Sequence, residues 1–139
     1  RIARPYQIAP YDVGGEHLDL TFSAAKDDKE ILQGGKDAFL TLWTPLIGFN
    51  EKYTLRLSPK SHLIDHPVKE IVKQNTYISP VFNEKYTKKF KFIRPRLKIG
   101  QAILFHPFLL HGSSFNYGMN SRLSIEIRLY NRHSRAWRD

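Results

Sequence analysis

The segment Arg122-Leu123-Ser124-Ile125-Glu126-Ile127-Arg128-Leu129-Tyr130 is the clearest structural signal in the chain. Arg122, Ser124, Glu126 and Arg128 fall on one face of an extended strand, and the leucines and isoleucines between them fall on the other. Alternation of this kind is typical of a strand whose two faces meet different surroundings. The segment therefore predicts a long β-strand over residues 122–130.

Shorter segments of strand character precede it, and glycine or proline bounds most of them. They cover residues 2–8, 17–22, 38–44 (expected to end near Pro45), 53–57, 90–93, 101–105 and 109–115. Residues 67–73 begin with Pro67 and instead predict a short helix.

Many short strands with glycine and proline between them favour a sandwich or a barrel, and their number suits a double-sheet jelly roll. We expect one all-β domain over residues 1–139, a double-stranded β-helix or jelly-roll barrel. Residues 60–89 are too long for an ordinary connection and predict a short helical or irregular insertion.

Composition narrows the class of protein. A chain of 139 residues is long enough for one hydrophobic core. The absence of cysteine excludes disulfides, thiolate metal sites and a cysteine nucleophile, and it agrees with a reducing, cytoplasmic location. No apolar run approaches the roughly 20 residues of a membrane-spanning helix, so we expect no membrane partner.

The net charge of +9 comes from 22 Lys and Arg against 13 Asp and Glu. Solubility is the simplest explanation of this excess, and an anionic small molecule is the partner that it favours for an enzyme. Basic residues gather within 85–98, interleaved with Tyr86, Phe90 and Phe92. A nucleic-acid surface has a similar pattern, but a solvated loop is more common, so nucleic acid is not the expected partner.

Three residues combine into a candidate metal site. His17 and Asp19 are two positions apart, so on a strand both side chains point the same way. His111, in the segment 109–113, is the candidate third group. Each alone is more often a hydrogen-bonded core or surface residue. Together, two histidines and a carboxylate are the ligand set of mononuclear non-haem iron(II) oxygenases, which leaves one face of the metal open.

Arg122 follows His111 closely, and we expect one tight turn and one antiparallel strand to separate them. Arg122 and Ser124 share a face of the predicted strand, so a guanidinium and a hydroxyl could hold one carboxylate together. The planar donors of arginine match two carboxylate oxygens at once. The alternative is an ordinary ion pair along the strand, with Glu126 as the acid.

The order and spacing of these motifs resemble the iron(II)/2-oxoglutarate-dependent dioxygenases, specifically the phytanoyl-CoA dioxygenase-like branch. Further segments agree with patterns of that branch. They are residues 42–46 (W-x-P-L), 57–62 (P-G-S-H), 99–105 (G-D-x-x-x-F), and His111, Ser113 and Asn116 (H-x-S-x-x-N). The resemblance extends from about His17 to Tyr130.

The resemblance implies that His17, Asp19 and His111 bind Fe(II). It also implies that Arg122 binds the far carboxylate of 2-oxoglutarate with help from Ser124 or Ser113. Trp43 would line the same site, although a core role is equally compatible with its sequence context. The expected reaction is hydroxylation of a small, anionic metabolite, with 2-oxoglutarate and molecular oxygen as cosubstrates.

Two other functions remain open: a non-catalytic jelly-roll module that binds carbohydrate or protein, and a basic nucleic-acid-binding domain. A cupin is less compatible, because its usual H-x-H pattern is absent. The sequence does not indicate an oligomeric state. Among the other histidines, His66 and His133 are expected in loops, and His106 is the rival of His111 or its outer partner.

Departures from the family pattern also carry expectations. Lys60 stands where the P-G-S-H pattern has glycine, so the geometry of that loop is open to question. Few residues precede His17, whereas family members commonly carry helices and strands there, and we expect that an N-terminal segment is missing from this chain. The presence of Asp19 disfavours the halogenase variant of the family, in which a small residue replaces the carboxylate.

Overall fold

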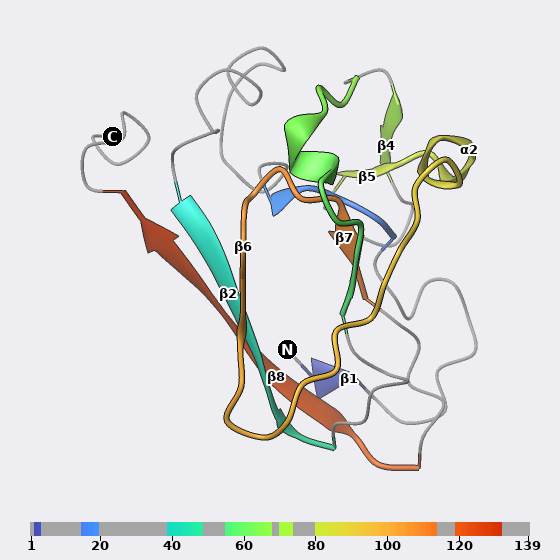
Figure 1. The fold of residues 1–139 in the computed structure, drawn as a ribbon. Helices are drawn as coiled ribbons and strands as arrows, with labels where there is room; N and C mark the ends of the chain where they lie inside the picture. Colours follow the sequence, from blue (N-terminus) through green and yellow to red (C-terminus); the bar gives the residue numbers. More distant parts are fainter. Residues whose placement is uncertain are drawn as a thin grey trace.

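The computed structural model describes residues 2–3, 15–19, 39–48, 55–67, 70–73, 80–113 and 119–131. These residues are mainly β (Figure 1), as the sequence predicted. The strands are β1 (Ile2–Ala3), β2 (Phe39–Ile47), β3 (Arg56–Leu57), β4 (Ile71–Lys73), β5 (Pro80–Phe82), β6 (Ile103–Phe105), β7 (His111–Gly112) and β8 (Arg122–Tyr130). The helices are a 3-10 turn (Ser61–Leu63) and α2 (Glu84–Thr87).

The larger sheet has the order β1-β8-β2-β6 and is antiparallel throughout. Its centre is the long pairing of β2 with β8, which runs from Phe39 opposite Tyr130 to Ile47 opposite Leu123. The strand predicted at residues 38–44 was expected to end near Pro45, and this was wrong, because β2 continues through Pro45 to Ile47. The register shifts between Pro45 and Ile47, and such an irregularity is where a strand tolerates proline.

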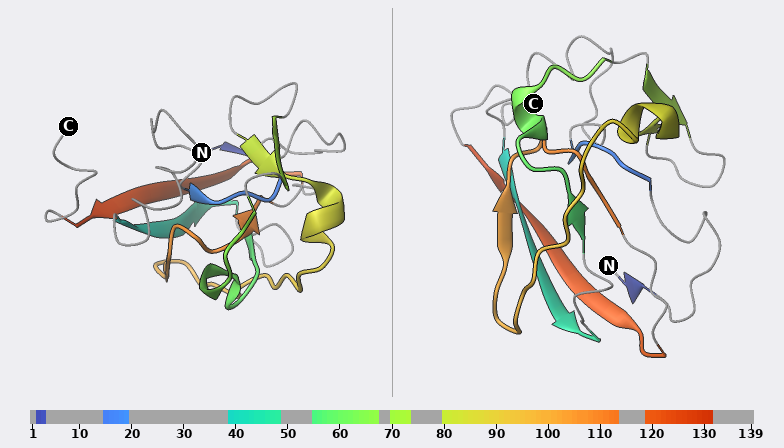
Figure 2. Two further views of the ribbon diagram at one scale, coloured as in Figure 1. Left: turned by 90° about the horizontal axis from the view of Figure 1, so that it is seen from above. Right: turned by 45° about the vertical axis from the view of Figure 1, so that its right-hand side comes forward.

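A second, smaller layer faces the large sheet (Figures 1 and 2). Its centre is the antiparallel pair β3–β7, and single bridges continue it to His17 on one side and to Ile93 on the other. The amide of Phe82 donates to the carbonyl of Glu16 at 2.8 Å, which connects β5 to the same layer. The predicted strands at 53–57, 90–93 and 109–115 are therefore shorter than expected, although each of these regions contributes to the layer.

His111 and Arg122 belong to different layers. β7 pairs with β3, whereas β8 pairs with β1 and β2. The expected antiparallel pairing of their strands was wrong, and the expected tight turn falls in residues 114–118, outside the described residues. The two layers face each other, so a residue of β7 and a residue of β8 can approach the same interior from opposite sides.

Apolar side chains fill the space between the layers. Trp43 from β2, Phe105 from β6 and Leu57 from β3 form one buried cluster with Leu55 and Leu109. A second buried cluster packs the insertion against the smaller layer and contains Leu18, Phe39, Phe82, Tyr86, Phe108 and Leu110. Leu18 and Leu110 belong to this second cluster, whereas Phe105, whose ring lies near that of His111, belongs to the first. This division is consistent with the alternation of side chains along a strand.

The described part of the insertion at 60–89 contains two short helices, in line with the predicted short helical insertion, and also the strands β4 and β5. The helix expected at 67–73 is wrong, because β4 there pairs with β5 in a two-stranded sheet. The β-branched pair Ile71-Val72 favours a strand over a helix. The sequence also did not lead us to α2, whose N-cap Asn83 accepts a hydrogen bond from the amide of Lys85 at 2.9 Å.

Lys60 and Gly48 both have a positive backbone φ. Lys60 has a φ of 67°, in the left-handed region that favours glycine, so the position where the resembled pattern has glycine does require that geometry. Gly48 also has a positive φ, and a Cβ there would lie 1.9 Å from the carbonyl oxygen of Ser121. Glycine therefore permits the end of β2 to approach the residue before Arg122.

Candidate metal and cosubstrate site

The structure brings His17, Asp19 and His111 together. One potential ligand atom from each lies within 4.8 Å of the others, and all three residues are buried. His17 and His111 exchange backbone hydrogen bonds, with N–O distances of 2.8 and 3.1 Å, and their ring centroids are 4.4 Å apart. The amide of Asp19 donates to the carbonyl of Pro107 at 3.0 Å. The predicted convergence of the two histidines and the carboxylate is therefore present, whereas their roles as metal ligands remain predictions.

Backbone carbonyls fix the tautomers of both histidines. The Nδ1 of His17 donates to the carbonyl of Gly15, and the Nδ1 of His111 donates to the carbonyl of Leu109, each at 2.8 Å. Since a carbonyl only accepts, each Nδ1 carries the hydrogen and each Nε2 presents a lone pair in the neutral ring. This outer hydrogen bond is what metal-binding histidines usually have.

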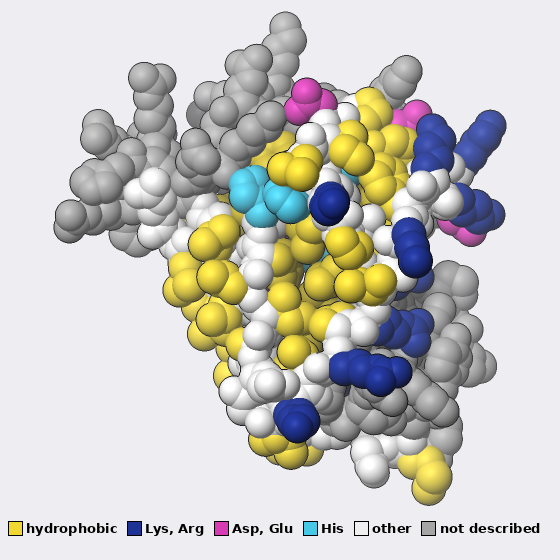
Figure 3. Space-filling view, viewed as in Figure 1, with side chains coloured by type: hydrophobic (Ala, Val, Ile, Leu, Met, Phe, Trp, Pro, Cys, Tyr) yellow, Lys and Arg dark blue, Asp and Glu magenta, His cyan; other side chains and the backbone are white. Residues whose placement is uncertain are grey.

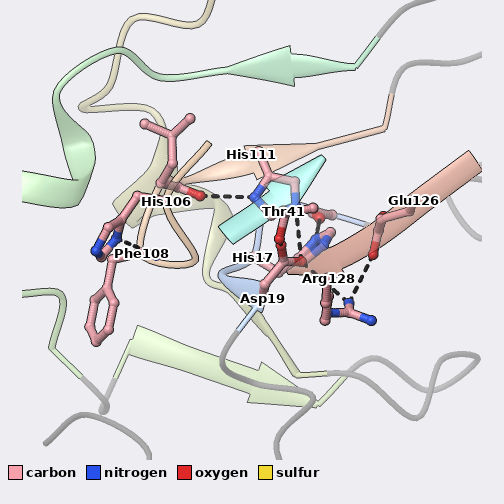
Figure 4. A network of polar contacts seen from close by, with 10 residues as sticks. His17, Asp19, Thr41, His106, Phe108, His111, Glu126 and Arg128 are labelled. Carbon is pink, nitrogen blue, oxygen red and sulfur yellow. Dashed lines mark hydrogen bonds and ion pairs between the residues drawn. The ribbon is translucent and has the colours of Figure 1, made fainter. Parts of the chain in front are cut away.

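The two oxygens of Asp19 have different surroundings (Figure 4). The hydroxyl of Thr41 donates to Oδ2. Among the described residues, none donates a hydrogen bond to Oδ1, which is buried and lies 3.4 Å from the Nε2 of His111. Nε2 of His111 and Oδ1 therefore need positive charge between them, which either a proton on the ring or a bound cation would supply. The donor set thus fits a divalent metal such as iron(II).

The charge state of Asp19 supports the same conclusion. Burial alone would raise the pKa of this carboxyl, but the proximity of His111, then the Thr41 hydroxyl and His17, lowers it to about 2. Asp19 is therefore an anion at any physiological pH. An anionic carboxylate is the form that binds a metal ion, so this charge state suits a ligand role.

Arg122, Ser124 and Ser113, the predicted cosubstrate residues, are all buried. Arg122 is only 3 % exposed, and its Nε and Nη1 atoms are shielded from solvent. Arg122 and Ser124 share the face of β8 that points toward the smaller layer, as predicted, and Ser113 directly follows β7. Their joint binding of a carboxylate remains a prediction.

Trp43 is a member of the apolar cluster between the layers, where it is 4 % exposed. In the same cluster is Phe105, whose ring centroid is 4.8 Å from that of His111. Trp43 therefore has the core role that its sequence context allowed, and a contact with a cosubstrate remains a prediction.

Sequence reasoning missed Thr41 and underestimated Arg128. Thr41 is fully buried on the inward face of β2 and lies opposite Arg128 in the register of β2 with β8. The Nη2 of Arg128 is 3.6 Å from Oδ1 of Asp19 and 2.8 Å from Oε1 of Glu126. The side chain of Arg128 is 30 % exposed, so it reaches from the buried carboxylate to solvent. Only the strand register, which the sequence does not provide, indicates these neighbours.

The remaining described histidines lie elsewhere. His106 accepts a hydrogen bond from the amide of Phe108 at 3.1 Å, and Figure 4 places both residues to one side of the triad. His66 lies outside any helix or strand, as expected, but it is buried: it is 2 % exposed and lies 2.9 Å from the carbonyl of Ser61 and 3.0 Å from the hydroxyl of Tyr86. His133 lies outside the described residues.

The basic residues of 85–98 are exposed and form a row along the right-hand side of Figure 3. The aromatic residues between them do not form an exposed platform, because Tyr86 is buried and Phe90 and Phe92 pack against the core. Nucleic-acid bases stack on exposed aromatic rings in many single-strand binders, and this segment lacks that feature. None of the described helices is long and apolar enough to cross a membrane.

Several solved structures share the fold of this chain. EvdO2 from Micromonospora carbonacea var. aurantiaca, complexed with 2-oxoglutarate, is 14% identical with a TM-score of 0.63, over 96% of this chain and 52% of that chain. The non-heme alpha ketoglutarate dependent carbocyclase SnoK from nogalamycin biosynthesis is 13% identical with a TM-score of 0.62, over 94% of this chain and 47% of that chain. The non-heme monooxygenase ThoJ is 18% identical with a TM-score of 0.59, over 95% and 44% of the two chains.

The TM-scores establish a shared fold, and the chain spans about half or less of the length of these proteins. The predicted fold class, a jelly-roll or double-stranded β-helix, is confirmed. No curated protein is significantly similar to the chain in sequence. The sequence model of one family, phytanoyl-CoA dioxygenase (PhyH), matches residues 9–124. The match covers most of the chain and includes Arg122, Ser124 and the three candidate metal ligands. The chain therefore belongs to the phytanoyl-CoA dioxygenase family.

Proposed function

We propose that this chain forms the catalytic core of an iron(II)- and 2-oxoglutarate-dependent oxygenase that hydroxylates a small, anionic metabolite. One observation carries the proposal. Two histidines with Nε2 lone pairs and one carboxylate of lowered pKa converge in a buried site, enclosed by the sheet face that carries Arg122. The absence of cysteine supports a reducing, cytoplasmic setting for such an enzyme.

His17, Asp19 and His111 would hold the metal on one face and leave the opposite face open. Iron(II) bound with 2-oxoglutarate supplies oxygen activation, in which decarboxylation to succinate and carbon dioxide accompanies insertion of one oxygen atom into a substrate C–H bond. The protein contributes orientation. Gly15 and Leu109 fix the histidine rings through their carbonyls, and Thr41 fixes the carboxylate.

Arg122 would bind the far carboxylate of 2-oxoglutarate, and Ser124 or Ser113 would donate a hydroxyl hydrogen bond to it. A buried guanidinium is the donor best suited to this task, since it offers paired, charge-assisted hydrogen bonds in a place with little water. Exclusion of water also strengthens the electrostatic attraction between the guanidinium and its anion.

The charge of the chain supports an anionic substrate. The net charge is +9, and Arg128 presents a partly exposed guanidinium close to Asp19. Such a group could attract a carboxylate or phosphate toward the open side of the metal. Proteins that share the fold include a carbocyclase and an epimerase as well as a monooxygenase. Among these reactions, we propose hydroxylation for this chain.

Formation of succinate from 2-oxoglutarate tests this proposal in the intact protein. We expect turnover that requires added iron(II), and its loss in His111→Ala. His106→Ala is the matched control, because His106 lies outside the triad, and it should retain turnover. Iron-independent succinate formation, or equal turnover in both variants, would contradict the proposal. Iron-independent binding of a carbohydrate or a protein would instead favour a non-catalytic module.

A further inference from the structure

The hydroxyl of Thr41 makes the two oxygens of Asp19 inequivalent. It donates to Oδ2, while Oδ1 lies 3.4 Å from the Nε2 of His111. The carboxylate is 1 % exposed and Thr41 is fully buried, so water does not compete for this hydrogen bond. Thr41 of β2 therefore makes a buried hydrogen bond that holds Oδ2.

The position of Thr41 is set by the larger sheet. It lies on the inward face of β2, opposite Arg128 of β8 and opposite Phe105 of β6. Pairing on both sides makes this a central position of the sheet. A threonine side chain has few χ1 rotamers, so its hydroxyl stays directed at the carboxylate.

Arg128 is the other candidate to orient Asp19, but its geometry is weaker. Its Nη2 is 3.6 Å from Oδ1, beyond hydrogen-bond distance, whereas the same atom is 2.8 Å from Oε1 of Glu126. The guanidinium thus contributes positive charge near the site. The hydrogen bond to the carboxylate comes from Thr41.

We propose that Thr41 is a positioning residue that makes Asp19 a one-oxygen metal ligand. With Oδ2 held by the hydroxyl, Oδ1 alone points toward the histidines. A carboxylate that bound through both oxygens would occupy a position on the face that the three ligands leave open for chemistry. This inference rests on the proposed function, because it takes the three residues as a metal site.

Titration of the intact protein with Co(II) tests the inference without turnover. Outer partners of metal ligands typically contribute about 10- to 100-fold to metal affinity. We expect Thr41→Val, which removes the hydroxyl at nearly constant shape, to weaken Co(II) binding by about this factor. Thr41→Ser, which keeps the hydroxyl, should bind close to wild type. The visible absorption of bound Co(II), which depends on coordination number, should change in Thr41→Val and not in Thr41→Ser.

Thr44→Val provides the matched control. It is the same substitution on the same strand, but the hydroxyl of Thr44 donates to the carbonyl of Gln101 at 2.9 Å, on the opposite face. Its Co(II) affinity and spectrum should equal those of wild type. If Thr41→Val does not fold, Thr41→Ser and Thr41→Ala differ by the hydroxyl alone, and the same 10- to 100-fold difference is expected between them.

Two results would overturn the inference alone: wild-type affinity and spectrum in the variant without the hydroxyl, or equal weakening in Thr41→Ser and Thr41→Val. The second would mean that packing of the threonine methyl matters and the hydroxyl does not. A failure of the proposed function is distinguishable, because wild type would then bind no Co(II), or would bind it as tightly as His111→Ala does.

Discussion

The two faces of β8 differ in a way that reverses the common arrangement of a sheet. The inward face carries Arg122 and Ser124, each 3 % exposed, followed by Glu126 and Arg128 nearer the surface. The outward face carries isoleucine and leucine, and Ile125, Ile127 and Leu129 are 41–47% exposed. Ordinarily an antiparallel sheet buries its apolar face and leaves the polar face in water.

This reversal supports our proposal that the interior of the barrel holds a site as well as a core. A buried arginine costs free energy unless an anion compensates it, so a chain keeps one there only with a partner for its charge. Trp43, Phe105 and Leu57 fill part of the interior with apolar contacts. The polar residues of β8, together with Asp19 and the two histidines, occupy the rest.

Substitution on the inward face should have the largest effect. Replacing Arg122 by glutamine would remove one partner of the proposed buried, charge-assisted pair with 2-oxoglutarate, and such a loss typically costs about 2 kcal/mol or more. We therefore expect the apparent KM for 2-oxoglutarate to rise about 30-fold or more. Metal affinity without cosubstrate should change little.

The matched control for this prediction is Arg128→Gln, on the same face but nearer the surface. Its KM for 2-oxoglutarate should rise much less. Equal effects of the two substitutions, or an unchanged KM in Arg122→Gln, would mean that the buried arginine does not bind the cosubstrate.

His66 provides a buried polar group away from β8, and its effect should be on stability. Burial lowers the pKa of His66 below its ordinary value, so the unfolded chain binds a proton more readily than the folded protein. The free energy of unfolding should therefore fall as the pH decreases below about 6.5, the ordinary pKa of histidine. Urea denaturation at neutral and mildly acidic pH would measure this change.

His66→Gln should make the free energy of unfolding less dependent on pH over the same range, even if it lowers stability overall. Other groups titrate identically in both proteins, so the difference between them isolates His66. A pH dependence equal to that of wild type would show that His66 does not titrate differently in the folded and unfolded states.

The outward face should give the smallest effect. Ile127→Thr places a β-branched polar residue at a position that is 46% exposed and compatible with a strand. We expect the free energy of unfolding to change by no more than about 0.5 kcal/mol, as for most surface substitutions. The KM for 2-oxoglutarate should stay the same. A large loss of stability would mean that this face is a buried core in the protein in solution.

The sequence predicted β8 well because its alternation is long and regular. Alternation alone could not predict which face points inward, since it is the same for either orientation, and only the family resemblance assigned the face with Arg122 and Ser124 to the interior. Ile71–Lys73 was mistaken for a helix because Pro67 suggested a helix start, whereas pairing with β5 determines its conformation. The bounds of the short strands also depended on contacts between distant segments, such as the bridge of Leu57 with Ile93.

The part of the candidate site that the sequence predicted consists of residues whose type and order match a known set of metal ligands and a carboxylate-binding arginine. His17, Asp19 and His111 converge as expected, and Arg122 is buried on the inward face. The surroundings of Asp19 were not predictable. Thr41 and Arg128 approach it only because β2 and β8 pair in one register, and a shift by one residue would have reversed which side chains point inward.

The central claim is that the inward polar face and the triad together bind iron(II) and 2-oxoglutarate. Anaerobic calorimetric titration of the intact protein with iron(II), followed by 2-oxoglutarate, tests it most directly. We predict saturable binding of one metal ion per chain, loss of that binding in Asp19→Ala, and cosubstrate binding that requires the metal. Undiminished iron binding in Asp19→Ala, or no saturable binding in wild type, would contradict the account.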